Sequence, residues 1–286
     1  MFARVCTTVL VGVAAVGSPL RAQTDFLNTD GGRPLHVQDA LSIEWKAIEL
    51  QLAPFKVERG VSGKWYGEME PELAIGLFPR THLSLGLPIR QLDTPRVGRG
   101  IERVAALAGA HLSLFHQLNL ETSLPAFAVR AETWLPVGPF APARAYPAIT
   151  GIATKTLSAL GPVRVHANVT RTLGNAPPRP DVCIAIFPPV CPPADTDGEV
   201  PRWLAGVAMD RAFPLHSTLI GAELTARQSV HNEEPVAWRI GTGVRHQFSA
   251  RFVLDGGVSR QIGGDDAHWA FTVGSALAIG TRRAGR

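Results

Sequence analysis

The chain has 286 residues, of which 45% are hydrophobic and 18% are charged. This composition excludes a disordered chain and a protein built of membrane-spanning helices, and it fits either a globular protein or a β-barrel. The formal net charge of +4 falls to +2 without residues 1–22, which leaves 26 basic and 24 acidic residues. That near balance argues against a nucleic acid as partner.

The N-terminus has the layout of a secretory signal peptide. Arg4 precedes an apolar run at 5–17, and then come Ser18, Pro19 and the small residue Ala22, after which we place the cleavage site. We then expect a short periplasmic segment at 23–37, a barrel at 38–280 and a tail at 281–286. No later segment offers about 18 consecutive apolar residues, so an exported chain that lives in a membrane is left with a closed barrel.

Successive segments show a period of two, which is typical of strands. We predict strands at 39–53, 64–78, 82–89, 103–115, 123–137, 145–157, 163–170, 202–212 and 217–228, and three more within 236–279. The phase slips in the first strand, which predicts a bulge near Ala47. Residues 91–102 are expected to form a charged loop, and the proline-rich segment 174–201 a long outer loop.

The C-terminal stretch shows the pattern most clearly. Trp238, Ile240 and Val244 alternate with Arg239 and Arg245, so one face is apolar and the other is charged or small. The same rule along almost the whole chain predicts an all-β fold, a transmembrane antiparallel up-and-down β-barrel of about twelve strands, with short periplasmic turns and longer extracellular loops. A soluble secreted β-protein with one buried face is the alternative.

Nine charged residues are expected to line the lumen: Glu68, Glu70, Glu72, Arg130, Glu132, Arg164, Arg239, Arg245 and Asp255. The three glutamates share one strand, while most of the arginines lie on strands across the ring. This predicts an acidic wall and a basic wall around a narrow wet passage. Alternatively these charges pair and plug the lumen, as buried charges should.

Other residue types are assigned structural roles. Cys183 and Cys191 are expected to form a loop disulfide in an oxidising compartment. Four tryptophans near strand ends are interpreted as membrane-interface anchors, namely Trp65, Trp203, Trp238 and Trp269. The histidines are scattered singly, so we assign no metal site and no cofactor.

An outer-membrane enzyme is an alternative from another functional class. Outer-membrane phospholipases place a histidine two residues before a serine on one strand, and this chain has that spacing at His82 with Ser84 and at His111 with Ser113. No acid or amide is plainly placed to orient either histidine. We therefore assign no catalytic residues.

Short motifs resemble a known family. The run Leu87 to Ile89 reads LPI, residues 254–257 read LDGG, and a GDD loop at 264–266 precedes Trp269. These features are similar to the outer-membrane barrels of the MetA-pathway of phenol degradation family. The resemblance implies an outer-membrane barrel that passes small hydrophobic or aromatic compounds.

The expected location is the cell outer membrane of a Gram-negative-type bacterium. The expected partners are outer-membrane lipid, the barrel-assembly machinery and a small-molecule solute, with no nucleic acid. A plugged barrel with a structural or adhesion role is the second candidate function.

Overall fold

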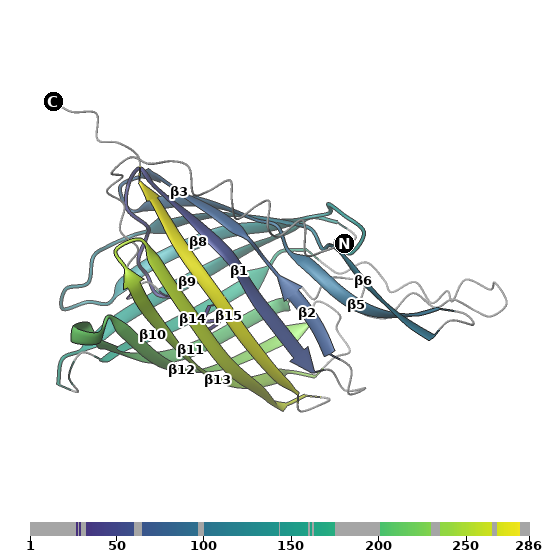
Figure 1. Cartoon of the computed structure of the whole chain (residues 1–286). Coiled ribbons are helices and arrows are strands. Elements are labelled where there is room, and N and C mark those ends of the chain that lie inside the picture. Colours follow the sequence, from purple (N-terminus) through teal and green to yellow (C-terminus); the bar gives the residue numbers. More distant parts are fainter. Residues whose placement is uncertain are drawn as a thin grey trace.

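The computed structural model describes residues 27, 29, 33–59, 65–96, 100–142, 144–159, 161, 163–174, 201–229, 235–264 and 268–280. These residues form one antiparallel sheet of fifteen strands, and β15 pairs back onto β1 to close it into a barrel (Figure 1). The predicted transmembrane-type barrel fold is therefore confirmed. The signal peptide, the two cysteines and the C-terminal tail lie outside the described residues.

The strands are β1 (Ala47–Arg59), β2 (Trp65–Met69), β3 (Glu72–Phe78), β4 (Thr81–Gly86), β5 (Ile89–Arg96), β6 (Gly100–Leu107), β7 (Ala110–Gln117), β8 (Ala126–Leu135), β9 (Tyr146–Leu157), β10 (Val163–Thr172), β11 (Pro201–Phe213), β12 (Thr218–Ser229), β13 (Ala237–Ser249), β14 (Phe252–Gly263) and β15 (Trp269–Gly280). The short 3-10 helix η1 (Pro214–His216) joins β11 to β12. Within the described ranges, no helix is long and apolar enough to cross a membrane.

Three strand positions are each divided in two: β2 with β3, β4 with β5, and β6 with β7. Pro71 and Pro88 stand at two of the breaks, where proline cannot donate a ladder hydrogen bond, and Gly109 stands at the third with a φ of 119°. The parts β3, β4 and β7 stay in the ring, while β2, β5 and β6 form a ribbon that projects from it (Figure 1). Twelve strands remain in the ring, as predicted.

Two predicted boundaries are wrong. The first strand was expected at 39–53, but β1 begins at Ala47, and the register shift lies between Leu52 and Phe55 instead of near Ala47. Residues 91–102, expected as a charged loop, fall largely in the β5–β6 hairpin. In the sequence, charged residues fall at both odd and even positions of 91–102, so this stretch lacks the alternation of a strand with one apolar side.

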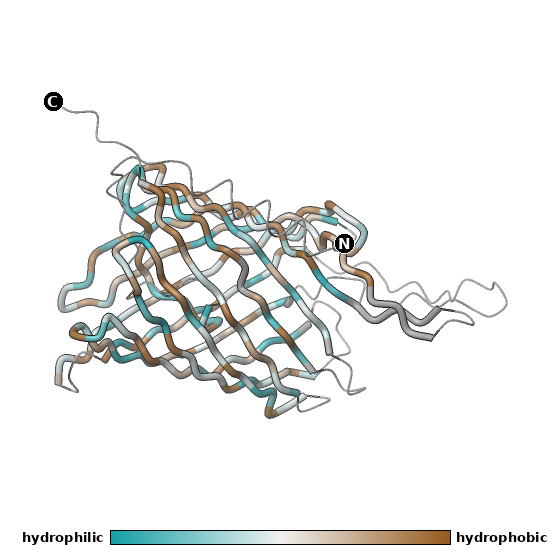
Figure 2. Tube along the Cα trace, in the orientation of Figure 1, coloured by the Kyte–Doolittle hydropathy of each residue, from teal (hydrophilic) through white to brown (hydrophobic). Residues whose placement is uncertain are grey.

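Hydrophobic and hydrophilic residues alternate along the strands of the ring (Figure 2). Many large apolar side chains are exposed, whereas many polar and small ones are buried. In β13, Ile240 and Val244 are exposed, whereas Arg239 and Arg245 are buried. A water-soluble barrel would bury its large apolar side chains. The reverse arrangement here suits a barrel surrounded by lipid.

The two rims of the barrel differ. Ala47 at the start of β1 pairs with Gly280 at the end of β15, so both chain ends of the ring lie at one rim, which also carries the short turns. We call it the short-turn rim, and the opposite one the long-loop rim. At a turn of the short-turn rim, burial of the Glu121 carboxyl raises its pKa, but hydrogen bonds from Thr156 and from Lys155 outweigh this effect and lower the pKa.

Candidate functional site

Residues 33–46, which we call the lumen segment, run through the interior of the barrel before β1 begins. The segment contacts β14 at Arg33, β12 at His36, β9 at Ala40 and β3 at Lys46. These strands lie on different sides of the ring, so the segment crosses the lumen. Residues 33–37, expected in the periplasm, are therefore placed against the inner wall.

Inner-face glycines leave the space that the lumen segment occupies. A Cβ atom at Gly243 would lie 2.5 Å from Pro34 Cβ, and one at Gly206 would lie 2.6 Å from Val37 Cγ2. Close approaches of the same kind to the segment occur at Gly76, Gly221, Gly257 and Gly274. The small residues that alternate with apolar ones in the sequence thus form a seat for this segment.

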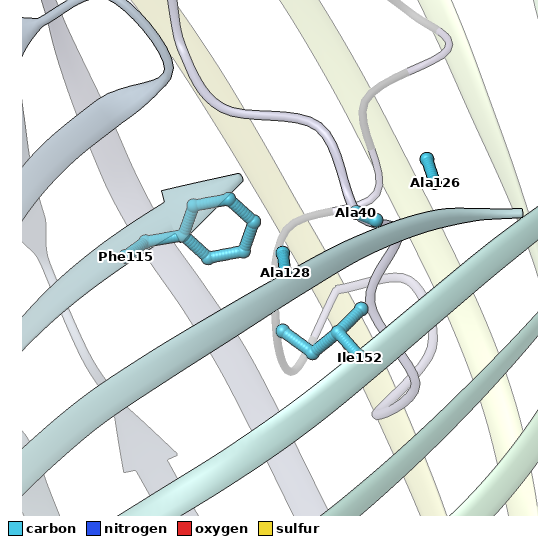
Figure 3. Packing of buried hydrophobic residues seen from close by; sticks show 5 residues of the cluster. All are labelled: Ala40, Phe115, Ala126, Ala128 and Ile152. Carbon is cyan, nitrogen blue, oxygen red and sulfur yellow. The ribbon is translucent and has the colours of Figure 1, made fainter. Parts of the chain in front are cut away.

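Two apolar clusters pack the lumen segment against the barrel wall. Figure 3 shows the first, in which Ala40 of the segment packs among residues of β7, β8 and β9, namely Phe115, Ala126, Ala128 and Ile152. In the second cluster, Leu35 and Val37 pack with Ala208 of β11. All of these side chains are buried, which stabilises the segment inside the ring.

Polar anchors fix the first half of the segment. Arg33 Nη1 donates to Asp255 Oδ2 at 3.2 Å, and Arg245 lies directly opposite Asp255 in the β13–β14 ladder. Further along, the backbone N–H groups of His36 and Val37 donate to Glu223 Oε2 at 2.7 and 2.9 Å. The Glu223 carboxylate is fully enclosed and therefore needs such donors.

A buried charge cluster holds the second half. Arg164 donates through Nε and Nη2 to both oxygens of Asp210 at 2.9 and 2.7 Å, and through Nη1 to Asp39 of the segment at 3.2 Å. His166 joins Asp210 through Nε2 at 2.9 Å and Thr154 through Nδ1 at 2.9 Å. One arginine therefore links two strands and the segment in a low-dielectric site.

The nine charged residues predicted for the lumen are all buried or half-buried: Glu68, Glu70, Glu72, Arg130, Glu132, Arg164, Arg239, Arg245 and Asp255. Several of them form ion pairs with residues nearby in the sheet. Arg90 pairs with Glu68 at 2.7 Å and Arg130 with Glu132 at 3.0 Å. Arg239 pairs with Glu58 of β1, not with the glutamates around β2. This local pairing is what the plugged-lumen alternative predicts.

A histidine and two glutamates that the sequence analysis did not connect meet on the inner face. His111 Nδ1 lies 3.2 Å from Glu70 Oε1, and Glu72 is close by. The other nitrogen of the same imidazole, His111 Nε2, lies 3.1 Å from Glu132 Oε2. Only the fold brings residues 70 and 111 together. The sequence offered one signal for such a cluster, namely the two nearby carboxylates Glu70 and Glu72 in one predicted strand.

A pocket opens above the lumen segment toward the long-loop rim. It is lined by His36, Lys56, Leu204, Thr225, Arg227, Ala237, Arg239 and Gln261. His36 of the segment forms part of the pocket lining, together with the basic side chains of Lys56, Arg227 and Arg239. The pocket is thus bounded by the segment and carries a basic lining.

The two histidine–serine pairs take part in ordinary hydrogen bonds. His82 Nδ1 lies 3.2 Å from Ser42 Oγ of the lumen segment, and the hydroxyls of Ser84 and Ser113 bond to each other at 2.7 Å. Both serines are buried on the inner face. This geometry does not present an activated serine to an ester substrate.

Three of the predicted interface tryptophans lie near the long-loop rim. Trp238 and Trp269 are 45% and 44% exposed, and Trp203 Nε1 donates to Gln228 Oε1. The strand β2 begins at Trp65 at the same rim, but its side chain lies outside the described set, as do Cys183 and Cys191. The exposed pair has the position expected of interface anchors.

Comparisons with known proteins support the fold. No family model matches the chain, and no curated protein matches it in sequence. Among solved structures, the COG4313 outer membrane channel from Pseudomonas putida F1 superposes with a TM-score of 0.55 at 11% identity, over 84% of this chain and 98% of that chain. KdgM porin superposes with a TM-score of 0.50 at 9% identity, over 82% of this chain and 99% of that chain.

These findings define the class of protein. A closed twelve-stranded antiparallel ring with an apolar outer face and a polar interior is the fold of an outer-membrane β-barrel. The resemblance to the MetA-pathway of phenol degradation family remains a prediction, because both structural similarities lie at or below 11% identity.

Proposed function

We propose that the protein is an outer-membrane channel for small molecules, and that the lumen segment is its removable plug. The observation that carries this proposal is the way in which the segment is held. Residues 33–46 are seated on glycines and anchored by side-chain hydrogen bonds, and they precede the ring instead of forming part of it. Their release would leave all twelve ring strands paired.

The pocket above the segment is the proposed binding place for the solute. It lies on the long-loop side of the plug, and the segment itself contributes His36 to it. A solute that enters from that side would meet Arg239 and Lys56 before it reached the plug. Lys56 and Arg239 also pair with Glu58, so the lining offers a solute polar contacts beside the apolar side chains of Leu204 and Ala237.

The ribbon supports the finer proposal that hydrophobic or aromatic compounds are carried. In the described part of the chain, β6 pairs with β5 alone, so strand pairing does not close the wall between β6 and β8. Residues after β8 contact the base of β6, where Phe140 N donates to Leu107 O at 3.0 Å. An apolar solute could approach the lumen along this unpaired edge without crossing a polar mouth.

A reversible crosslink tests the plug. We would replace Val37 and Gly206, whose side-chain positions nearly touch, by cysteine and record conductance in planar bilayers. Wild-type protein should show discrete current steps under oxidising conditions. The Val37→Cys, Gly206→Cys variant should lose them and regain them on reduction. Wild type under the same reduction controls for Cys183 and Cys191.

The outcomes separate the two candidate functions. Steps of equal size and frequency in crosslinked and wild-type protein would show that ions pass without movement of the segment. A folded wild type that gives no steps and no solute flux into liposomes would favour the structural or adhesion role instead. Channel activity together with crosslink sensitivity is the expected result.

A further inference from the structure

Two carboxylates and one imidazole converge on the inner face where the ribbon leaves the ring. Ligand atoms of Glu70, Glu72 and His111 all lie within 4.8 Å of one another. Glu70 stands at the break between β2 and β3, Glu72 begins β3, and His111 lies at the start of β7. We infer that this cluster binds a divalent transition-metal ion of the zinc type.

Gly86 of β4 provides the room for the cluster. Glu72 lies opposite Gly86 on one side of the ladder, and His111 lies opposite it on the other. Residues two strands apart are normally separated by about 10 Å. Because Gly86 has no side chain, the side chains of its two neighbours can approach each other above it. A Cβ atom there would collide with Glu70 Oε1, so the third ligand also uses this space.

The orientation of His111 is set by residues behind it. Its Nε2 lies 3.1 Å from Glu132 Oε2, and Arg130 holds the same carboxylate oxygen at 3.0 Å. The imidazole stacks on Trp134 with the ring centroids 4.6 Å apart and the planes 5° from parallel. Nδ1 is left facing Glu70. Histidines that bind metals usually donate their other ring N–H to a carboxylate in this way.

Metal binding requires the neutral imidazole, and the geometry then leaves Nδ1 for the ion. A neutral imidazole has one N–H and can donate to only one of the two carboxylates that face it. With that proton directed at Glu132, the Nδ1 lone pair faces Glu70, and a cation between them would bind both. One nitrogen and two carboxylates suit zinc and its neighbours, whereas calcium and magnesium prefer six or more oxygen ligands.

The ion would join β2, β3 and β7 at the base of the ribbon. Because only the folded barrel brings these three groups together, zinc should stabilise the folded state over the unfolded chain. The site is independent of the plug and of the proposed channel activity.

Zinc binding to the full chain tests the inference. Protein folded in detergent and stripped with a chelator would be dialysed against zinc, and bound metal would be quantified per chain. Wild type should bind about one ion and unfold at a higher temperature with zinc than without. His111→Gln and Glu72→Gln should each weaken binding at least ~10-fold, and Glu132→Gln, which removes no ligand, by about 10 to 100-fold.

Matched substitutions away from the cluster serve as controls. His246→Gln and Glu121→Gln make the same chemical changes elsewhere and should bind zinc as wild type does. Heat-modifiable gel mobility would verify that each variant is folded. The inference is overturned if folded wild type binds no zinc, if both ligand variants bind it equally well, or if calcium binds as tightly as zinc.

Discussion

Arg33 of the lumen segment donates from Nη1 to the carboxylate of Asp255 on β14, 222 positions further along the chain, at 3.2 Å. Both side chains are almost completely enclosed, with exposed fractions of 1% and 0%. The contact joins the start of the segment to the last hairpin of the ring. A buried pair of this kind loses about 3–5 kcal/mol when one partner is removed.

Arg33→Gln should therefore shift the lumen segment toward release. The loss cannot exceed the free energy that holds the segment in place, since Asp255 becomes hydrated once the segment has moved away and Arg245 still lies opposite it. We expect more frequent or longer current steps in planar bilayers, with the ring still folded. Arg260→Gln, at an exposed outward-facing position, is the control. Unchanged gating in Arg33→Gln would contradict a plug anchored at Asp255.

Gly243→Val should displace the segment by steric overlap. A Cβ atom at this position would already lie 2.5 Å from Pro34 Cβ and 3.1 Å from the backbone oxygen of Gly256. Overpacking of this kind typically costs about 1–3 kcal/mol. The measurement is proteolysis of the N-terminal region, which should become faster. Gly151→Ala is the matched control, because a Cβ atom there would meet nothing within 4 Å. Equal cleavage rates in the two variants would refute the seat.

Asp210→Asn should be strongly destabilising. The substitution removes the charge that Arg164 and His166 share, while Arg164 stays buried against Asp39. We expect a loss of about 3–5 kcal/mol in the free energy of unfolding, measured by urea titration in detergent micelles. A loss below about 1 kcal/mol would show that the cluster is hydrated or that Asp39 compensates for the missing charge.

Glu121→Gln should have a small effect that depends on pH. The folded-state pKa of Glu121 is lowered, so its contacts stabilise the protein above the ordinary glutamate pKa and stop doing so as the pH falls through the lowered value. The group is largely solvent-accessible, so the loss should stay below about 1 kcal/mol at neutral pH. Urea titrations of wild type and variant should converge in acid. A constant difference would argue against this carboxylate as the cause.

Trp238→Phe with Trp269→Phe should reduce fluorescence quenching by lipids brominated near the headgroup. Both indoles are nearly half exposed near the long-loop rim, where the membrane interface is expected. Trp134→Phe is the control, since Trp134 stacks on His111 at the inner face and its removal should not reduce the quenched signal. Equal quenching in all variants would contradict the interface assignment.

The period of two made the barrel predictable. In β13 and β15, most outward residues are apolar, with Thr242 and Ser275 as exceptions, and the inward ones are charged, polar or small. Lipid favours that pattern on every strand of the ring. In residues 91–102, charged residues fall at both odd and even positions of the sequence, so this rule does not apply there. Most of β5 was therefore predicted to be a charged loop, whereas most of β6 lies within the predicted strand 103–115. Before Ala47 the error was the reverse, a strand predicted where none forms. Leu41, Ile43 and Trp45 show the alternation of a strand but do not pair in a ladder.

The lumen was less predictable than the wall. Inward-facing charges could be assigned from the alternation, yet their partners could not, since Asp39 meets Arg164 through the path of the lumen segment and Glu70 meets His111 across β4. The glycines that carry the lumen segment resembled any small residue of an inner face. Their role depends on the lumen segment, which precedes the ring in the sequence and folds back into it.

The sequence by itself determined that the chain forms a barrel, which side chains face outward, and that about twelve strands close the ring, because these features follow from local alternation in contact with lipid. Only the tertiary structure decided what fills the lumen. Contacts such as Arg33 with Asp255 depend on the curvature of the whole ring, and no local pattern of residues records which positions curvature brings face to face.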